Sequence, residues 1–276
     1  MSEAAGASRP VVAAVQMVSG PELGANLAEA ERLVAEAAAA GAQLVALPEN
    51  FPLMGYREGD KLAIAEPEGR GPIQAFLAEQ ARRHGLVLVG GTIPLQGSGG
   101  ERVRAAEAVY GPDGRRLACY DKIHLFDVEL EGGEAYRESR TLEPGRTPVV
   151  VDTPLGRLGL AVCYDLRFPE LFRALVEQGA ELLVVPSAFT AATGQAHWEV
   201  LLRARAVENL CYVVAPNQGG EHASGRCTHG DTMVVEPWGG VLGRLAGGPG
   251  VVTAEVDRDR LRSLRARFPA LEHRIL

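Results

Sequence analysis

One cysteine in this chain stands where a nucleophile is expected. Cys163 follows the apolar run RLGLAV, which predicts a strand, and precedes YDLRFPEL, which turns into a helix opened by Pro169. A helix N-terminus and a nearby cation both lower a thiol pKa and favour the reactive thiolate, so a sulfur at this junction suits catalysis. A buried structural cysteine is the alternative interpretation. Nothing in the surroundings of Cys119, Cys211 or Cys227 favours them as strongly.

Two other residues can assist a cysteine nucleophile. Glu49, in LPEN, comes directly after a buried run, and a carboxylate there can take a proton from a thiol and return it to a leaving amine if partial burial raises its pKa. Lys122 lies in CYDKIHL, where Tyr120, Lys122 and His124 share one face of an alternating strand. A lysine that points inward needs a carboxylate partner, so we expect it near developing negative charge. The alternatives are an acid exposed in a turn and a lysine on the solvent face.

The elements that must position these residues follow an α/β pattern, in which short β-branched runs alternate with alanine-rich or amphipathic stretches. The expected strands are VVAAVQM, AQLVALPEN, GLVLVGGTIP, RLGLAV, ELLVVPSAF and CYVVAPNQ, and the expected helices cover 26–40, 73–84, 198–208 and 258–265. Residues 101–125 are expected to form two antiparallel strands around a PDG turn, which makes the sheet mixed. HGDTMVVEPWGG and VVTAEVD are expected to pair as a closing hairpin.

Three of these strands end in a proline followed by polar residues, in LVALPEN, LLVVPSAF and YVVAPNQ. The carboxyl ends of strands in α/β sheets form the crevice where ligands bind, so we expect Glu49, Ser187 and Asn217 on one rim. The chain shows no linker, repeat or low-complexity segment. Residues 1–276 are therefore expected to form one domain.

Composition favours a compact soluble protein over a nucleic-acid-binding or membrane protein. The chain has 276 residues, a net charge of -7 and no basic block to follow a phosphate backbone. The start MSEAAGASRP lacks the pattern of a secretory signal, and no run has the roughly 18 to 20 apolar residues of a membrane span. The four cysteines form no CxxC pair, so free thiols and a cytoplasmic location are expected.

A metal hydrolase is the rival chemistry to consider. The six histidines form no HExxH or HxH motif, and the only cluster is Cys227, His229 and Asp231 in RCTHGD. A loop with ordinary polar contacts is the favoured interpretation of this cluster, with a metal site as the alternative. Trp198 shares a helical face with Leu201, Leu202 and Arg205, which favours a core or interface anchor over a substrate-stacking residue.

Taken together, these segments resemble the nitrilase or carbon-nitrogen hydrolase superfamily over nearly the whole length. The blocks that carry the resemblance are LPEN, YDKIHLFDVE, AVCYDLRFPEL and TGQAHWEVLLRARAVENLCYVV. Within the superfamily the chain looks most like amidases that act on deaminated glutathione, with ω-amidases close behind. The implied fold is an αββα sandwich with a mixed sheet, and two such protomers pack helix to helix as a homodimer or higher homo-oligomer.

The resemblance implies a catalytic set of Glu49, Lys122 and Cys163. It also implies a second active-site glutamate after the lysine strand, which the RESRTLEPG block places at Glu138. This carboxylate can orient Lys122 or position the substrate amide. Its alternative interpretation is a surface acid in a loop.

In ω-amidase-like relatives an arginine beyond the cysteine and a threonine before the TGxAHW helix bind the substrate carboxylate. They correspond to Arg167 and Thr193 here. A guanidinium offers a two-pronged contact to a carboxylate, which suits the role. The alternative for Arg167 is a salt bridge with Glu170 or Asp165.

Two departures from the family pattern are visible. Ala105 stands where relatives often carry an asparagine, and the C-terminal tail ends early, at LEHRIL. The tail commonly packs at a subunit interface in relatives, so its short form leaves the assembly open.

The resulting hypothesis is a cysteine-dependent amidase that needs no cofactor and releases ammonia from a small carboxylate-bearing amide, such as deaminated glutathione, through a thioester. Lys122 and the backbone N–H of Tyr164 would stabilise the oxyanion. The alternatives are an ω-amidase acting on α-ketoglutaramate and an N-carbamoyl amidohydrolase. A noncatalytic interaction module is the rival from outside the enzymes.

Overall fold

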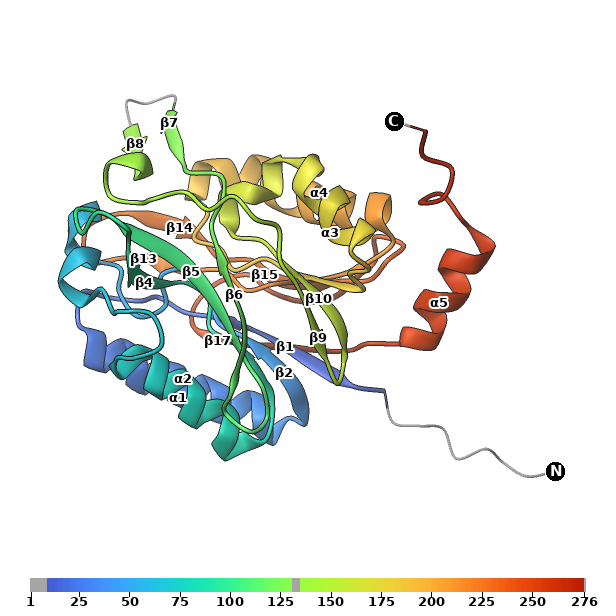
Figure 1. Ribbon diagram of the computed structural model, residues 1–276, viewed down its shortest axis with the longest axis horizontal. Coiled ribbons are helices and arrows are strands. Elements are labelled where there is room, and N and C mark those ends of the chain that lie inside the picture. Colours follow the sequence, from blue (N-terminus) through green and yellow to red (C-terminus); the bar gives the residue numbers. More distant parts are fainter. Residues whose placement is uncertain (1–8, 131–134, 276) are drawn as a thin grey trace.

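Two β-sheets lie face to face between two layers of helices in the computed structural model, which describes residues 9–130 and 135–275 (Figure 1). The predicted αββα sandwich with mixed sheets is confirmed. Residues 1–8, considered above for a secretory signal, and Leu276 of the short tail lie outside the described residues. Within the described ranges, no helix has both the length and the apolar character to cross a bilayer.

The first sheet holds the N-terminal strands. Its members are β1 (Val11–Gln16), β2 (Ala42–Ala46), β3 (Val87–Val89), β4 (Ile93–Gln96), β5 (Val103–Tyr110), β6 (Arg116–Asp121) and β17 (Gly250–Glu255). β1, β2 and β3 run parallel, β17 is antiparallel to β1, and β5 pairs with β3 and β4 on one edge and β6 on the other. The helices α1 (Leu23–Ala39) and α2 (Pro72–His84) cover the outer face (Figure 1).

The second sheet has the order β16-β15-β12-β11-β10-β9. Its strands are β9 (Val150–Thr153), β10 (Gly156–Leu160), β11 (Leu182–Val184), β12 (Tyr212–Ala215), β15 (Thr232–Val235) and β16 (Val241–Leu245). The helices α3 (Pro169–Glu177) and α4 (Ala191–Asn209) form the other outer layer, and α5 (Arg258–Arg267) follows β17 (Figure 1).

Short elements connect the layers near the rim. They are three 3₁₀ turns, η1 (Glu58–Ile64), η2 (Glu138–Arg140) and η3 (Cys163–Arg167), and two small hairpins, β7 (Asp127–Glu129) with β8 (Ala135–Arg137) and β13 (Gly219–Glu221) with β14 (Cys227–His229).

Alternation along the buried strands builds two cores at once. Val12 and Ala14 of β1 face the second sheet, whereas Ala13 and Val15 face the α1 and α2 layer, and all four are fully buried. Burying one valine side chain contributes about 1.5 to 3 kcal/mol, so each such strand stabilises both layers. The sandwich thereby holds the carboxyl ends of the parallel strands in place, and the rim beyond them carries the site.

Two predicted elements are wrong in detail. GLVLVGGTIP forms two strands, β3 and β4, because Gly91 has φ 54° and an added Cβ there would lie 2.1 Å from the Pro48 carbonyl oxygen. The predicted closing hairpin does not form: β15 pairs with β16, and β17 crosses to the other sheet and pairs with β1. Alternating apolar residues predict that a segment is a strand but not which partner it takes.

Candidate active site

Cys163 lies at the end of β10, at the first residue of η3, where its backbone has φ 47°. This left-handed conformation is rare for a residue with a side chain and persists only when the surroundings enforce it. The N–H of Cys163 donates to the carbonyl of Pro186 at 3.0 Å. The N–H of the preceding Val162 donates to the Asp165 carboxylate at 2.8 Å. The turn is thus fixed on both sides of the sulfur.

Asp165 is the anchor of this turn and has no exposed surface. Its carboxylate also accepts from the Tyr120 hydroxyl at 2.7 Å and from the His124 backbone at 3.0 Å, and it contacts the His124 ring at 2.6 Å. The His124 ring stacks on Phe168 just before α3, with centroids 3.7 Å apart. Sequence reasoning missed this role, because Asp165 was considered only as an alternative partner of Arg167.

Lys122 is almost fully buried, at 1% exposure, and points into a pair of carboxylates. Its Nζ donates to Glu49 Oε1 at 2.8 Å and to the two oxygens of Glu138 at 3.1 and 2.9 Å. Glu138 is placed by η2 and also accepts from the backbone N–H of Phe126 at 2.8 Å. Three residues that are far apart along the chain therefore form one buried ion cluster.

The charges of this cluster act on one another. Burial works against the ammonium of Lys122, but the charges of Glu138 and Glu49 outweigh it and raise the pKa of Lys122 well above its usual value. Burial raises the pKa of the Cys163 thiol well above its ordinary range, the charge of Glu49 adds to the effect, and Lys122 opposes it. The prediction that the helix terminus and a cation lower this thiol pKa is wrong, since burial and Glu49 prevail.

Cys163, Glu49 and Glu138 line one cavity together with most of the other predicted site residues. Tyr164, Arg167 and Thr193 are part of its wall. The remaining lining residues are Phe126, Ala188, Phe189, Thr190 and Arg226, and none of these was singled out from the sequence.

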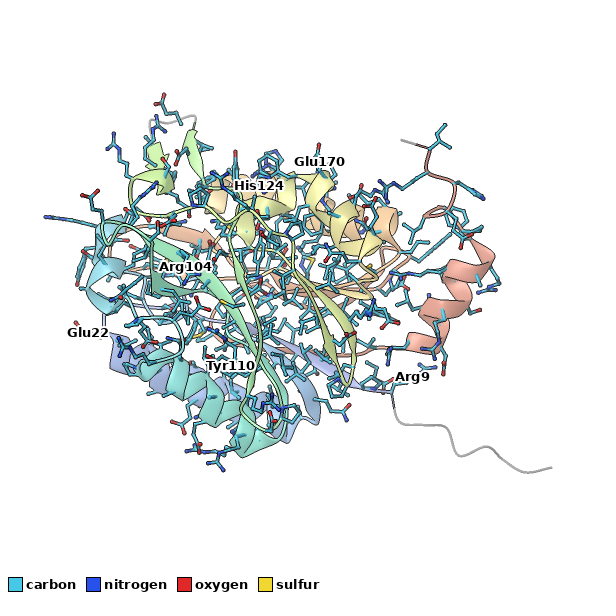
Figure 2. The ribbon with its side chains drawn as sticks, in the orientation of Figure 1. Arg9, Glu22, Arg104, Tyr110, His124 and Glu170 are labelled. Atoms are coloured by element: carbon cyan, nitrogen blue, oxygen red, sulfur yellow. The ribbon has the colours of Figure 1, made fainter. Side chains whose placement is uncertain are left out.

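Arg167 makes no ion pair with Glu170 or Asp165 within the described ranges. Its guanidinium contacts the His197 ring at 3.2 Å and lies 5.4 Å from the Phe189 ring centroid. Figure 2 shows Glu170 on α3, at the outside of the molecule. The guanidinium of Arg167 is thus positioned at the cavity by the His197 ring and an aromatic face and not by a carboxylate, a setting that suits an anionic ligand.

Thr193 belongs to the first turn of α4. Its backbone N–H donates to the side chain of Thr190, the N-cap residue, and the two hydroxyl oxygens lie 2.8 Å apart. The N-cap geometry fixes both hydroxyls at the cavity wall.

The predicted rim forms in part. Ser187 and Asn217 form a bridge between the extensions of β11 and β12. Glu49 is connected to them through its backbone carbonyl, which accepts from the side chain of Gln218 at 3.1 Å. Ala105, where relatives often carry asparagine, accepts a backbone hydrogen bond from Lys122 at 3.0 Å.

The RCTHGD segment forms ordinary polar contacts. Asp231 is ion-paired with Arg244, and the His229 ring lies 3.7 Å from its carboxylate, while Cys227 is exposed. Among the described residues, no group of three His, Cys, Asp or Glu side chains is arranged to hold a metal ion. Trp198 is fully buried and donates to the Asp231 carbonyl at 2.7 Å, so its interpretation as a core residue is confirmed.

Comparison with known proteins supplies independent findings. A family model described as carbon-nitrogen hydrolase matches residues 11–266. The chain is 45% identical over 269 residues to a deaminated glutathione amidase of Synechocystis, covering 96% of this chain and 98% of that protein. It is 38% identical over 261 residues to the omega-amidase NIT2-B of Xenopus laevis, covering 94% of this chain and 93% of that protein.

Solved structures agree in fold. Nit3 of Saccharomyces cerevisiae, described as a member of branch 10 of the nitrilase superfamily, matches with a TM-score of 0.88 and 30% identity over 98% of both chains. The NitFhit protein of C. elegans matches with a TM-score of 0.87 and 38% identity. The match covers 97% of this chain and 65% of the NitFhit chain, so this chain spans about two thirds of that protein.

Proposed function

This chain belongs to the carbon-nitrogen hydrolase family and is an amide-hydrolysing enzyme, and we propose that Cys163, Lys122 and Glu49 carry its reaction. The observation that supports the assignment most strongly is the buried Lys122 ammonium, held 2.8 Å from Glu49 and 2.9 Å from Glu138, since these two carboxylates line the same cavity as Cys163. A noncatalytic interaction module would have no use for such an arrangement, since an ion cluster in a core is costly unless its geometry is needed.

The proposed cycle begins with a neutral thiol. Glu49 accepts the proton as Cys163 Sγ attacks the carbonyl carbon, and a C–S bond forms while the carbonyl oxygen becomes an oxyanion. The Lys122 ammonium and the Tyr164 backbone N–H stabilise that oxygen. Glu138 holds Lys122 from the other side, so the ammonium keeps its orientation when Glu49 becomes protonated.

The leaving group departs when the C–N bond breaks and Glu49 gives its proton to the nitrogen. A thioester remains on Cys163. Water attacks its carbonyl carbon while Glu49 takes a proton from the water; the C–S bond then breaks, Glu49 returns that proton to Cys163 Sγ, and the carboxylic acid is released. A primary amide releases ammonia in this scheme. Deaminated glutathione contains only secondary amides, so cleavage of its γ-linked bond releases the amine of cysteinylglycine instead.

Deaminated glutathione is the substrate we propose, with α-ketoglutaramate as the second candidate. Relatives named deaminated glutathione amidase at 45% identity and an omega-amidase at 38% identity support the two choices in that order. Both compounds carry a carboxylate on the acyl side of the scissile bond. Arg167 and Thr193, on the cavity wall, are the proposed ligands of that carboxylate.

Cys163→Ala tests the nucleophile, with Cys227→Ala as the matched control because Cys227 is exposed and lies outside the cavity. We expect the first variant to lose hydrolysis of both amides and the second to keep it. Full activity in Cys163→Ala would discard the mechanism. Comparing kcat/KM of the wild type for the two amides ranks them, and a preference for an N-carbamoyl compound would overturn both.

We further propose that residues 1–276 form one catalytic domain that assembles as a homodimer in the cytoplasm. The outer face of α4 supports the assembly, because Val200 is 61% exposed, Val207 47% and the nearby Trp238 55%. An apolar helical face of this kind suits helix-to-helix packing. The four free cysteines fit a reducing compartment. Sedimentation showing a stable monomer would contradict the dimer.

A further inference from the structure

A second hollow, with a volume of about 290 Å³, adjoins the outer side of the catalytic cavity. It lies between the segment that leads into η1 and the outer hairpin strand β8, and Arg226 is part of the wall of both spaces. The catalytic cavity itself offers only about 20 Å³, little more than the space of one ordered water. The outer hollow is the larger of the two spaces, and Arg226 borders both, so a bulky leaving group can extend into it.

The hollow is basic although the protein as a whole carries a net charge of -7. Its wall includes the cations Arg57, Lys61, Arg137 and Arg226 and a single carboxylate, that of Glu58. Glu58 lies 3.0 Å from Lys61 and 3.7 Å from Arg226, so one carboxylate is shared by two cations. A concave surface with an excess of positive charge attracts and orients anions.

Arg226 occupies the junction of the two spaces, because it is part of the wall of both. Its Nη2 donates to the carbonyl of Ala188 at 3.1 Å, and its guanidinium lies 5.1 Å from the Tyr136 ring centroid. Its Nη1 lies 3.7 Å from the Glu58 carboxylate, which is longer than an ordinary hydrogen bond. A ligand carboxylate at the junction can therefore contact this guanidinium more closely than Glu58 does.

We propose that the outer hollow is a leaving-group subsite in which Arg226 binds a carboxylate on the amine side of the scissile amide. The inference rests on the proposed function and extends it. Arg167 holds the acyl-side carboxylate, Arg226 holds the leaving-side carboxylate, and Cys163 attacks between them. The substrate class is then an amide with an acidic group on each side, such as a γ-linked peptide whose leaving amine ends in a free carboxylate.

The test is a cycle of two enzymes and two substrates. Wild type and Arg226→Gln are assayed with deaminated glutathione and with its glycine methyl ester, which lacks the terminal charge. α-Ketoglutaramate has no carboxylate on the leaving side, so its hydrolysis is the reference against which the losses with the acid and the ester are compared. A hydrogen bond to a charged group corresponds to about 10- to 100-fold in binding, so wild type should prefer the acid over the ester by that factor, mainly through KM. Arg226→Gln should lose that preference.

Two further variants keep the result interpretable. Arg226→Lys retains the charge without the planar fork and should retain part of the preference. Arg115→Gln, an exposed arginine in the turn between β5 and β6, is the matched control and should behave as wild type. Equal losses for acid, ester and α-ketoglutaramate in Arg226→Gln, or an acid preference that survives the substitution, would overturn the subsite. A wild type that hydrolyses none of the three amides would instead overturn the proposed function.

Discussion

Replacing Lys122 with methionine should destabilise the protein strongly, because the change leaves two buried carboxylates facing each other without a cation. The side chains of Lys122, Glu49 and Glu138 are 1%, 4% and 13% exposed, so water can replace little of the lost interaction. Breaking a buried ion pair by removing one partner costs about 3 to 5 kcal/mol. At roughly 2 to 4 °C per kcal/mol for a domain of this size, the melting temperature should fall by about 6 to 20 °C.

The chain offers a matched control, because Lys61 is its only other lysine. Lys61 pairs with Glu58 at 3.0 Å; the Lys61 side chain is 13% exposed and the Glu58 side chain 39%. Water can therefore solvate the Glu58 carboxylate when the cation is removed, so Lys61→Met should cost about 1 kcal/mol and shift the melting temperature by only a few degrees at about 2 to 4 °C per kcal/mol. Thermal unfolding followed by circular dichroism measures both variants.

The loss of stability in Lys122→Met should depend on pH in a definite direction. Without the ammonium, two buried carboxylates face each other, and they repel each other only while both are charged. Protonation at low pH removes this repulsion, so the destabilisation grows as the pH rises. The deficit of Lys122→Met should shrink toward pH ~5, and a second change, Glu138→Gln, should restore part of the stability at neutral pH. A loss no larger than that of Lys61→Met would refute the argument that this cluster is a desolvated ion network.

Two other predictions follow from the electrostatics. Glu49→Gln removes a charge that raises the pKa of the Cys163 thiol, so iodoacetamide should alkylate Cys163 faster near pH 8. Amide hydrolysis should fall by about 10²- to 10⁴-fold, because the general base is lost. A loss of both alkylation and hydrolysis would contradict the base role of Glu49. Glu107 is fully buried, neither of its carboxylate oxygens has a partner in the described chain, and burial together with the Asp165 charge raises its pKa well above the usual value. The wild type therefore loses stability as the pH rises from about 4 toward that raised pKa. Over this range the free energy of unfolding of Glu107→Gln, measured by denaturant titration, should exceed that of the wild type by an amount that grows by up to ~1.4 kcal/mol per pH unit. A gain that does not depend on pH would contradict the raised pKa of Glu107.

Local patterns were enough to place Glu49 and Cys163 on elements, since each follows the end of a predicted strand. AQLVA precedes LPEN and RLGLAV precedes the cysteine, and carboxyl strand ends in an α/β protein share a rim. The resemblance to a known superfamily implied that Glu49, Lys122 and Glu138 belong to one site, and the structure brings them together in one buried cluster. Spacing alone did not predict it, because β2, β6 and η2 belong to segments that only the tertiary fold brings together.

What escaped prediction depends on partners that no single segment encodes. The β16 strand is short and contains Gly243 and Arg244, so its pairing with β15 had no clear signal, and β17 was assigned in its place. Asp165 acts through hydrogen bonds to Tyr120 and His124, which lie about 40 residues earlier in the chain. The arginine of the junction, Arg226, is positioned by a turn between two short strands, where neither periodicity nor a motif marks the site.

The raised thiol pKa decides how the cysteine is activated. With a neutral thiol, one ammonium and two carboxylates, the buried set of Cys163, Lys122, Glu49 and Glu138 carries one excess negative charge. A thiolate formed in advance would add a second negative charge in this buried set, at a large desolvation cost. Transfer of the thiol proton to Glu49 during attack leaves the net charge of the set unchanged, because one anion replaces another. The charge then moves from sulfur to the substrate oxygen, toward Lys122, so the cluster favours proton transfer concerted with attack and keeps the cysteine unreactive until a carbonyl carbon is in place.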